Sequence, residues 1–131
     1  MTRQVQVAID CADPDRLARF WAEALGYEVE NPSPAPDEPG ERWNAVVDPA
    51  GTGPRVLFHS VPEGKVVKNR VHLDVRAGGP RGTPIAVRRP LVDAEVTRLL
   101  DADATHVRTT EDESDYYAVM LDPEGNEFCI C

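Results

Sequence analysis

The stretch Ala118-Val119-Met120-Leu121-Asp122-Pro123-Glu124-Gly125 decides the fold, because the middle of the chain carries nearly the same one, Ala45-Val46-Val47-Asp48-Pro49-Ala50-Gly51. In both copies an apolar, strand-like run stops at Asp-Pro-x-Gly. Aspartate bonds its own backbone two residues on, proline presets φ for the turn, and glycine accepts a positive φ. Each copy therefore predicts a hairpin turn between two strands.

A second pair of similar stretches lies near the start of each half of the chain. Residues 5–10 (VQVAID) and 71–75 (VHLDV) alternate in the manner of strands, and a helical pattern follows each of them. The chain therefore predicts two copies of one βαβββ module, and an internal repeat of this kind determines the architecture.

In the first module, Asp13 followed by Pro14 is a typical helix start, and Gly26 provides the left-handed stop. Between them an apolar stripe recurs at helical spacing: Leu17, Phe20, Trp21, Ala24 and Leu25. Strands are predicted at residues 27–29, 43–47 and 55–61. Residues 31–41 form a proline-rich polar loop without a core signal.

In the second module, a strand is predicted at residues 69–75, followed by a loop rich in glycine, proline and arginine at residues 77–90. The second helix then presents one apolar side: Leu91, Val92, Val96, Leu99 and Leu100. Asp103 stands where Gly26 stands in the first copy, and aspartate tolerates the left-handed conformation. Strands follow at residues 105–108, 116–121 and 127–131.

Composition narrows the class of protein. The chain has 131 residues, of which 41% are hydrophobic, and this suffices for one domain or two small modules sharing a core. The formal net charge of −9 argues against nucleic acid and anionic membranes as partners. No apolar run would span a bilayer, and the N-terminus lacks a secretion leader. An odd count of three cysteines favours a reducing cytoplasm.

Strand alternation separates two faces of each predicted sheet. The continuously apolar set should face the helices: Val5, Val7, Ile9, Val56, Phe58, Val71, Leu73, Val75, Phe128 and Ile130. The opposite face carries polar or ligand-capable groups on four strands. Sheets curved around that face would form a cup lined by Gln6, His59, His72, Asp74, Glu127 and Cys129.

Three blocks of sequence resemble the vicinal oxygen chelate superfamily, the glyoxalase/bleomycin-resistance/dioxygenase group. They are Asp13-Pro14 with Phe20-Trp21 and Leu25-Gly26-Tyr27, then Lys68-Asn69-Arg70-x-His72-x-Asp74, and finally residues 122–129 (DPEGNEFC). The last two blocks are most similar to its actinobacterial glyoxalase-like subgroup. The resemblance covers almost the whole chain and implies an α+β fold, in which two βαβββ modules with curved mixed sheets form a cup and the helices lie outside. We expect modules at residues 1–61 and 69–131, joined by a linker at 62–68, in one compact domain.

The resemblance also implies where a metal would bind, since metal-dependent members take ligands from the first and last strand of each module. These positions hold Gln6 and His72 on the first strands and Cys129 at the end of the second module. The position ending the first module falls at Leu57, Phe58 or His59, depending on the gap. The standard pair of glutamates is absent, and this set suits Mg²⁺, Mn²⁺ or Ni²⁺ poorly. We therefore expect no metal cofactor. A zinc site would be built from His59, His72 and Cys129, and an altered ligand set for a metal would be Gln6, His59, His72 and Cys129.

Each candidate has a structural alternative. His72, Asp74 and Glu127 are candidate catalytic groups, with His72 as ligand or general base. Alternatively, His72 lines a pocket without chemistry and Asp74 pairs with Arg70 or Arg76. The basic run Lys65, Lys68, Asn69 and Arg70 would either bind an anion or serve as a structural linker. Cys129 is either a nucleophile or an inert residue of the pocket wall. His59 is either a pocket residue or a histidine at the end of a strand. Trp43 and Tyr117, at equivalent points of the repeats, line the ligand pocket or pack the sheet.

Two main hypotheses about function follow. The first is a cytoplasmic small-molecule pocket protein without the standard metal, either a sequestering protein or a metal-free enzyme using His72 and Asp74. The second is a metal-dependent lyase, isomerase or dioxygenase with altered ligands. A dimerisation module with an empty cup is a third. Glyoxalase I activity is not expected, because that chemistry needs a polarising metal and a carboxylate base. The resemblance favours a homodimer.

Overall fold

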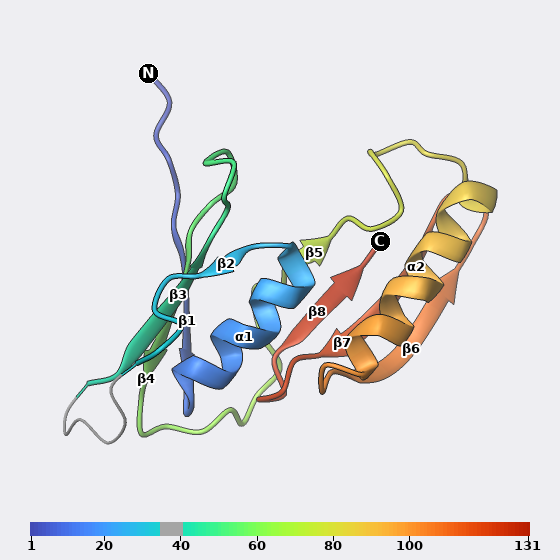
Figure 1. Cartoon of the computed structure of the whole chain (residues 1–131). Coiled ribbons are helices and arrows are strands. Elements are labelled where there is room, and N and C mark those ends of the chain that lie inside the picture. The colour runs from blue at the N-terminus through green and yellow to red at the C-terminus, as the bar shows by residue number, and fades with distance from the viewer. Residues whose placement is uncertain (35–40) are drawn as a thin grey trace. The chain divides into compact units, whose positions relative to one another are not determined.

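A computed structural model describes residues 1–34 and 41–131, so most of the predicted loop at residues 31–41 lies outside the described residues. The chain divides into two compact units, Met1–Lys65 and Val66–Cys131 (Figure 1). The first contains β1 (Val7–Cys11), α1 (Pro14–Leu25), β2 (Glu28–Val29), β3 (Trp43–Val47) and β4 (Val56–Ser60). The second contains β5 (Asp74–Val75), α2 (Ile85–Leu100), β6 (Thr105–Glu111), β7 (Tyr116–Leu121) and β8 (Glu127–Ile130).

Both units build the same mixed sheet. The strand orders are β1-β4-β3-β2 and β5-β8-β7-β6, with one parallel pair in each sheet, β1 with β4 and β5 with β8. The neighbouring pairs are antiparallel. The α+β class and the repeated βαβββ module are thus confirmed.

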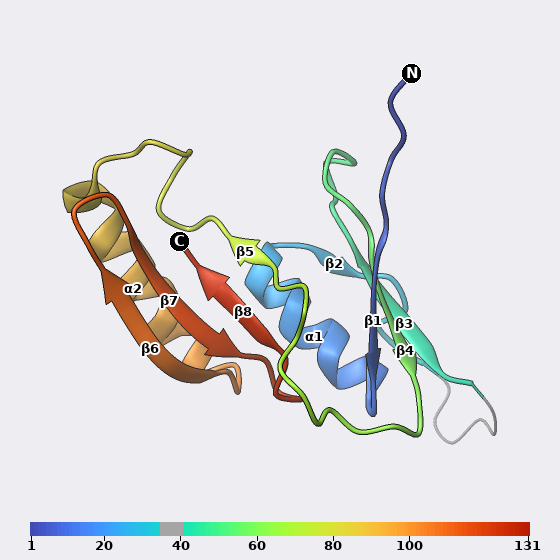
Figure 2. The ribbon, with the colours of Figure 1, turned by 180° about the vertical axis from the view of Figure 1, so that it is seen from behind.

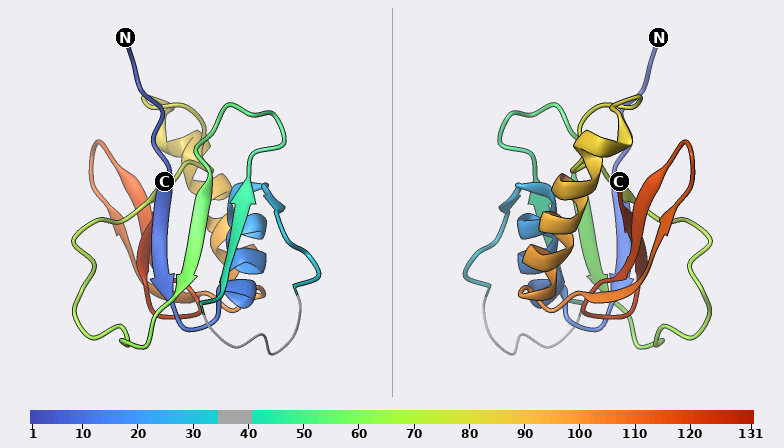
Figure 3. Two further views of the ribbon diagram at one scale, coloured as in Figure 1. Left: turned by 90° about the vertical axis from the view of Figure 1, so that its left-hand side faces the viewer. Right: turned by 90° about the vertical axis from the view of Figure 1, so that its right-hand side faces the viewer.

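In each unit one helix covers one face of the sheet. Seen from behind, β6 and β7 lie in front of α2 (Figure 2), and the left view of Figure 3 shows α1 behind β3. Side chains that alternate toward the helices are buried, among them Val56 and Phe58 in one sheet and Phe128 and Ile130 in the other. Each unit therefore keeps a second sheet face without a helix.

The repeated turns form as the sequence predicts. Gly51 and Gly125 adopt φ of 73° and 83°, and their N–H groups donate to the carbonyls of Asp48 and Asp122. The Asp122 carboxylate accepts from the N–H groups of Glu124 and Asn126 at 2.9 and 3.0 Å. Asp122 is buried, so these bonds satisfy a carboxylate that would otherwise be destabilising.

Helix α1 has the predicted bounds. The Asp13 carboxylate caps it by accepting from the N–H of Arg16, and Gly26 ends it at φ 68°. Leu17, Phe20 and Trp21 are buried against the sheet. In the second unit Asp103 adopts φ 75°, which confirms its left-handed conformation.

The predicted start of the second helix was wrong. Helix α2 begins at Ile85, inside the predicted loop of residues 77–90, and contains Pro90. Contacts outside the helix hold this early turn, since the Arg88 guanidinium donates to the Asp115 carboxylate and to the carbonyl of Tyr116. The predicted apolar side is also only partly buried: Val92 and Leu99 are buried, whereas Leu91 and Leu100 are exposed.

Three strand boundaries differ from prediction as well. The first strand begins at Val7 and that of the second module at Asp74, so Val5 and Val71 lie outside the sheets and are exposed. Their parallel partner strands begin only at Val56 and Glu127, so Val5 and Val71 lie before the first residues that could pair with them. Strand β6 instead continues to Glu111, because it pairs with the full length of β7. Within the described residues, neither helix is long and apolar enough to cross a membrane.

Candidate functional site

The helix-free face of the second sheet carries a pocket of about 1150 Å³, and the described residues that line it belong to the second unit. Its floor comes from the side chains of β7 and β8 that point away from α2: Tyr117, Val119, Leu121, Glu127, Cys129 and Cys131. These alternate with Tyr116, Ala118, Met120, Phe128 and Ile130, which are buried on the helix side. The strand period of two therefore creates both the core and the pocket floor.

Strand register orders the floor into rows. Asp74, Cys129, Val119 and Arg108 lie side by side across β5, β8, β7 and β6. The next row toward the C-terminal end of β8 contains Cys131, whose N–H and carbonyl bond Val75 and Ala77 on either side of Arg76. The row on the other side contains Glu127 and Leu121.

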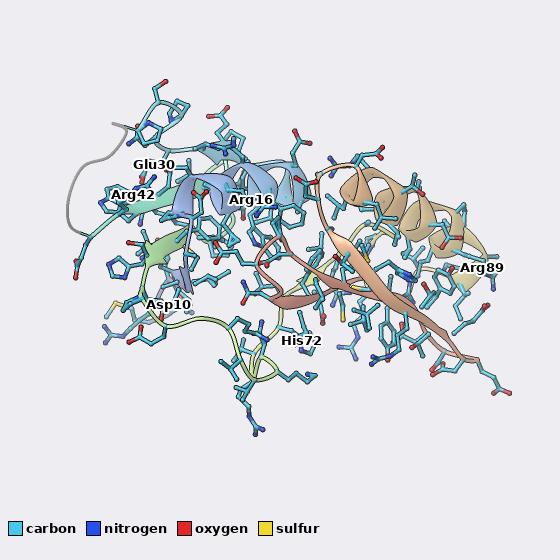
Figure 4. All side chains as sticks on the ribbon, turned by 90° about the horizontal axis from the view of Figure 1, so that it is seen from below. Asp10, Arg16, Glu30, Arg42, His72 and Arg89 are labelled. Atoms are coloured by element: carbon cyan, nitrogen blue, oxygen red, sulfur yellow. The ribbon has the colours of Figure 1, made fainter. Side chains whose placement is uncertain are left out.

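His72, Asp74 and Cys129 form a close group. Their candidate ligand atoms all lie within 4.8 Å of one another, and His72 Nε2 is 3.4 Å from Asp74 Oδ1. Figure 4 places His72 on the segment before β5, across the second sheet from α2. The ion pair of Asp74 with Arg70 or Arg76 does not form among the described residues; Asp74 is paired with His72 instead.

The two pocket cysteines are poor nucleophiles. Burial raises the pKa of the Cys129 thiol, and the Asp74 carboxylate raises it further. The pKa of Cys131 is raised by the same two causes. Both groups are therefore thiols at neutral pH, because only a lowered pKa yields a reactive thiolate.

Glu127 forms hydrogen bonds with the segment that precedes β5. Its Oε2 accepts from the N–H of Asn69 at 2.9 Å, and its carbonyl accepts from the Asn69 side chain at 3.4 Å. Lys68 of the same segment lines the pocket. Arg70, another member of the predicted basic run, is exposed and does not line it.

The candidates of the first unit have local partners. Gln6 accepts from Arg55 at 2.9 Å, and the Arg55 guanidinium lies 5.6 Å from the centre of the half-exposed Trp43 ring. His59 pairs with Asp10 across β1 and lies 3.5 Å from Glu41. Gln6 and His59 are separated by four positions along adjacent strands, roughly 13 Å, so this unit does not bring them together.

The two registers make the modules comparable position by position. Leu57 pairs with Ala8 as Cys129 pairs with Asp74, so Leu57 is the counterpart of Cys129 and Gln6 the counterpart of His72. Trp43 and Tyr117 then correspond, as predicted. The four positions at which the superfamily resemblance places metal ligands thus hold Gln6, Leu57, His72 and Cys129, and this set lacks the carboxylate oxygens that a hard divalent ion prefers.

Sequence reasoning missed three basic residues of the pocket, Arg81, Arg88 and Arg108. The first two lie in the segment that was predicted only as a loop rich in glycine, proline and arginine. Arg108 follows an irregularity between His106 and Arg108 in β6, which interrupts strict alternation. The density of arginine and glycine at residues 76–89 was the signal that could have identified the first two.

The sequence matches the family model described as "Glyoxalase-like domain" over residues 6–131. No curated protein matches significantly. Among solved structures, a glyoxalase/bleomycin resistance protein/dioxygenase family enzyme from Burkholderia phytofirmans PsJN is 20% identical with a TM-score of 0.67, and covers 95% of this chain and 94% of its own. A domain of the same description from Frankia sp. EAN1pec is 15% identical with a TM-score of 0.65, covering 99% and 96%.

A mutant of the fosfomycin resistance protein FosX from Listeria monocytogenes, complexed with Mn(II) and 1S,2S-dihydroxypropylphosphonic acid, has a TM-score of 0.70. It is 8% identical and covers 99% of this chain and 91% of its own. At such identities these structures share the fold with this chain, and a shared fold alone does not establish a shared reaction.

Proposed function

The chain belongs to the glyoxalase-like domain family, and on that premise we propose that it binds a small organic molecule on the helix-free face of its second sheet, without a hard divalent ion at the superfamily's ligand positions. The observation that carries the proposal is the pocket of about 1150 Å³, which combines apolar side chains along β7 with convergent polar groups. Such a combination is typical of small-molecule sites.

The pocket fits either sequestration or metal-free catalysis. In the catalytic version, His72 acts as the general base and Asp74, 3.4 Å away, orients its ring. Glu127 lies on the same face but is engaged by Asn69, so it contributes to the shape of the site.

The test combines a ligand screen with elemental analysis. Thermal shifts of the full chain against a broad set of organic acids, phenols and amides should identify ligands that raise Tm, and chelator should not change those shifts. His72→Ala should weaken the response, whereas His106→Ala, a histidine of the same unit outside the pocket lining, should not. A set in which no compound raises Tm would overturn the proposal and favour a module with an empty cup.

A second candidate function rests on the group His72, Asp74 and Cys129. Imidazole, carboxylate and thiolate are all zinc ligands, so this group suits Zn²⁺ better than a harder ion. Elemental analysis of protein purified without a metal-binding tag separates the candidates. About one equivalent of zinc, lost in His72→Ala and kept in His106→Ala, would support a metal-dependent lyase, isomerase or dioxygenase; background metal in all samples supports the first proposal.

We further propose that the protein acts in the cytoplasm as a homodimer. Among the described residues the three cysteines form no disulfide, which suits a reducing compartment. Several large apolar side chains are exposed, among them Val87, Leu91, Leu100 and Val107, and exposed apolar surface favours association.

A further inference from the structure

Basic side chains are concentrated in the pocket of an acidic protein. The chain has 14 lysine and arginine residues against 23 aspartate and glutamate residues. Five of the basic residues line this one pocket: Lys68, Arg76, Arg81, Arg88 and Arg108.

Most of these pocket cations lack a carboxylate partner. Arg88 is neutralised by Asp115 at 2.9 Å, and outside the pocket Arg89 pairs with Glu111 and Arg98 with Glu95. The other four pocket cations have no carboxylate oxygen within 4.0 Å among residues 1–34 and 41–131. Since acidic groups outnumber basic ones in this chain, four uncompensated cations in one pocket are a local feature of the site.

The lining has one carboxylate fewer than its five cations, namely Asp74, Glu113, Asp115 and Glu127. Asp115 is held by Arg88, Asp74 faces His72, and Glu127 accepts from Asn69. Glu113 is the remaining acidic residue of the lining. The pocket therefore keeps a surplus of positive charge although the whole chain carries −9.

Two of the cations occupy positions next to floor residues in the strand register. Arg108 lies in the same strand row as Cys129 and Val119, and Arg76 lies next to Cys131. The positive charges of Arg108 and Lys68 act on the Cys129 thiol, and those of Arg76 and Arg88 act on the Cys131 thiol. Tyr117, Val119 and Leu121 alternate along β7 on the same face and give the pocket an apolar surface beside these cations.

We propose that the ligand is an amphiphilic organic anion, whose carboxylate or phosphate is bound by Arg76, Arg81 and Arg108 and whose apolar body packs on Tyr117, Val119 and Leu121. This inference rests on the proposed small-molecule function of the same pocket. Guanidinium groups bind carboxylate and phosphate through paired, charge-assisted hydrogen bonds, which distinguishes an anion from a neutral molecule of the same shape.

The test uses three probes with one aromatic body: 2-naphthoate, 2-naphthyl phosphate and the neutral 2-naphthamide. Calorimetric titration of the full chain at low ionic strength should give a Kd for at least one anion about tenfold or more below that of the amide. The tighter of the two anions identifies carboxylate or phosphate as the preferred group. Amide chemical shifts of Val119 and Cys129 should change on binding and locate the probe.

Variants then assign the preference to the pocket cations. Arg76→Gln combined with Arg108→Gln should reduce the preference for the anion to about threefold or less. Arg98→Gln removes the same charge from α2, which covers the opposite face, and should preserve the preference.

The outcomes separate this inference from the function beneath it. Equal binding of amide and anion, or an anion preference that survives the double substitution, would overturn the inference and leave a small-molecule pocket in place. Failure of all three probes to bind or to shift the floor amides, together with a ligand screen in which no compound raises Tm, would overturn the proposed function itself.

Discussion

The pocket thiols illustrate how the surroundings of one residue determine its chemistry. Burial and the Asp74 carboxylate raise the pKa of both Cys129 and Cys131. We expect alkylation of both by iodoacetamide at pH 7.5 to be slower than that of free cysteine, and Asp74→Asn to accelerate it. Peptide mass spectrometry over time measures each rate. Alkylation of Cys129 as fast as free cysteine would restore it as a candidate nucleophile.

Asp48 makes part of the stability dependent on pH. The N–H groups of Ala50 and Gly53 donate to its carboxylate at 2.8 and 2.7 Å and lower its pKa. A carboxyl with a lowered pKa stabilises the fold above its unfolded-state pKa, about 3.9, and loses that contribution as the pH falls through the folded value. Urea unfolding between pH 7 and pH 2.5 should therefore show a smaller loss of stability on acidification in Asp48→Asn than in the natural chain. An identical pH profile would contradict this account.

Gly53 is required because of a close approach rather than its backbone angles. A Cβ at this position would lie 2.0 Å from the Tyr27 hydroxyl oxygen and 3.1 Å from the ring carbon that bears it. Gly53→Ala should lower the free energy of unfolding by about 1–3 kcal/mol, as overpacking does. Adding Tyr27→Phe should restore part of the loss. Gly64→Ala, which would meet nothing within 4 Å, is the matched control and should be neutral in the same denaturation experiment.

At this scale the sequence identified the turn residues and the polar face well. Asp48, Asp122 and Gly26 act through bonds to their own neighbours, so local sequence contains the information. The close approach of Gly53 to Tyr27 joins separate segments and has no local signal. His72, Asp74 and Cys129 were predicted to share a face from alternation, and the pairing of β5 with β8 places Asp74 beside Cys129.

Helix α2 contains a residue that disfavours helical structure. Pro90 lies within it and lacks the N–H that would otherwise bond the carbonyl of Ala86, so it weakens the helix. Pro90→Ala should raise the free energy of unfolding by about 1–3 kcal/mol. Pro14→Ala is the control: proline suits the first position of α1 and Pro14 is buried, so this change should give no gain. Equal effects of the two substitutions in urea unfolding would contradict the explanation.

The early start of α2 shows where prediction of an element fails. Proline, glycine and arginine at residues 80–90 predict a loop locally, and the helix forms there because Arg88 is bound by Asp115 and by the carbonyl of Tyr116 in a distant part of the chain. In α1 the cap, the stripe and the stop all agree, and the predicted bounds were right.

For the whole molecule, the proposed homodimer has a direct test. Light scattering coupled to size exclusion should give about twice the 14.4 kDa of one chain, since the exposed apolar side chains favour association. A mass equal to one chain at all concentrations would contradict it. The measurement should be repeated with bound ligand, because a ligand that binds one assembly state preferentially stabilises it.

The internal repeat made the architecture predictable, because each copy contains its own strand pattern, helix and turn. Function was less predictable, since the two copies have diverged at equivalent positions: Leu57 stands where the second module has Cys129, and Gln6 where it has His72. Sequence alone did not decide which residue of the first module corresponds to Cys129, because the alignment of the two modules was ambiguous there. The strand register identifies it as Leu57.

The irregularity in β6 places one residue in the pocket wall that has no partner in the register with β7. Val107 lies between two regular pairings, His106 with Met120 and Arg108 with Val119, and lines the pocket. Deleting its codon would leave every other cross-strand pair of β6 and β7 in place and remove one side chain from the wall. At this position the protein is open to change by chain length as well as by substitution, so ligand preference can diversify here while the scaffold stays intact.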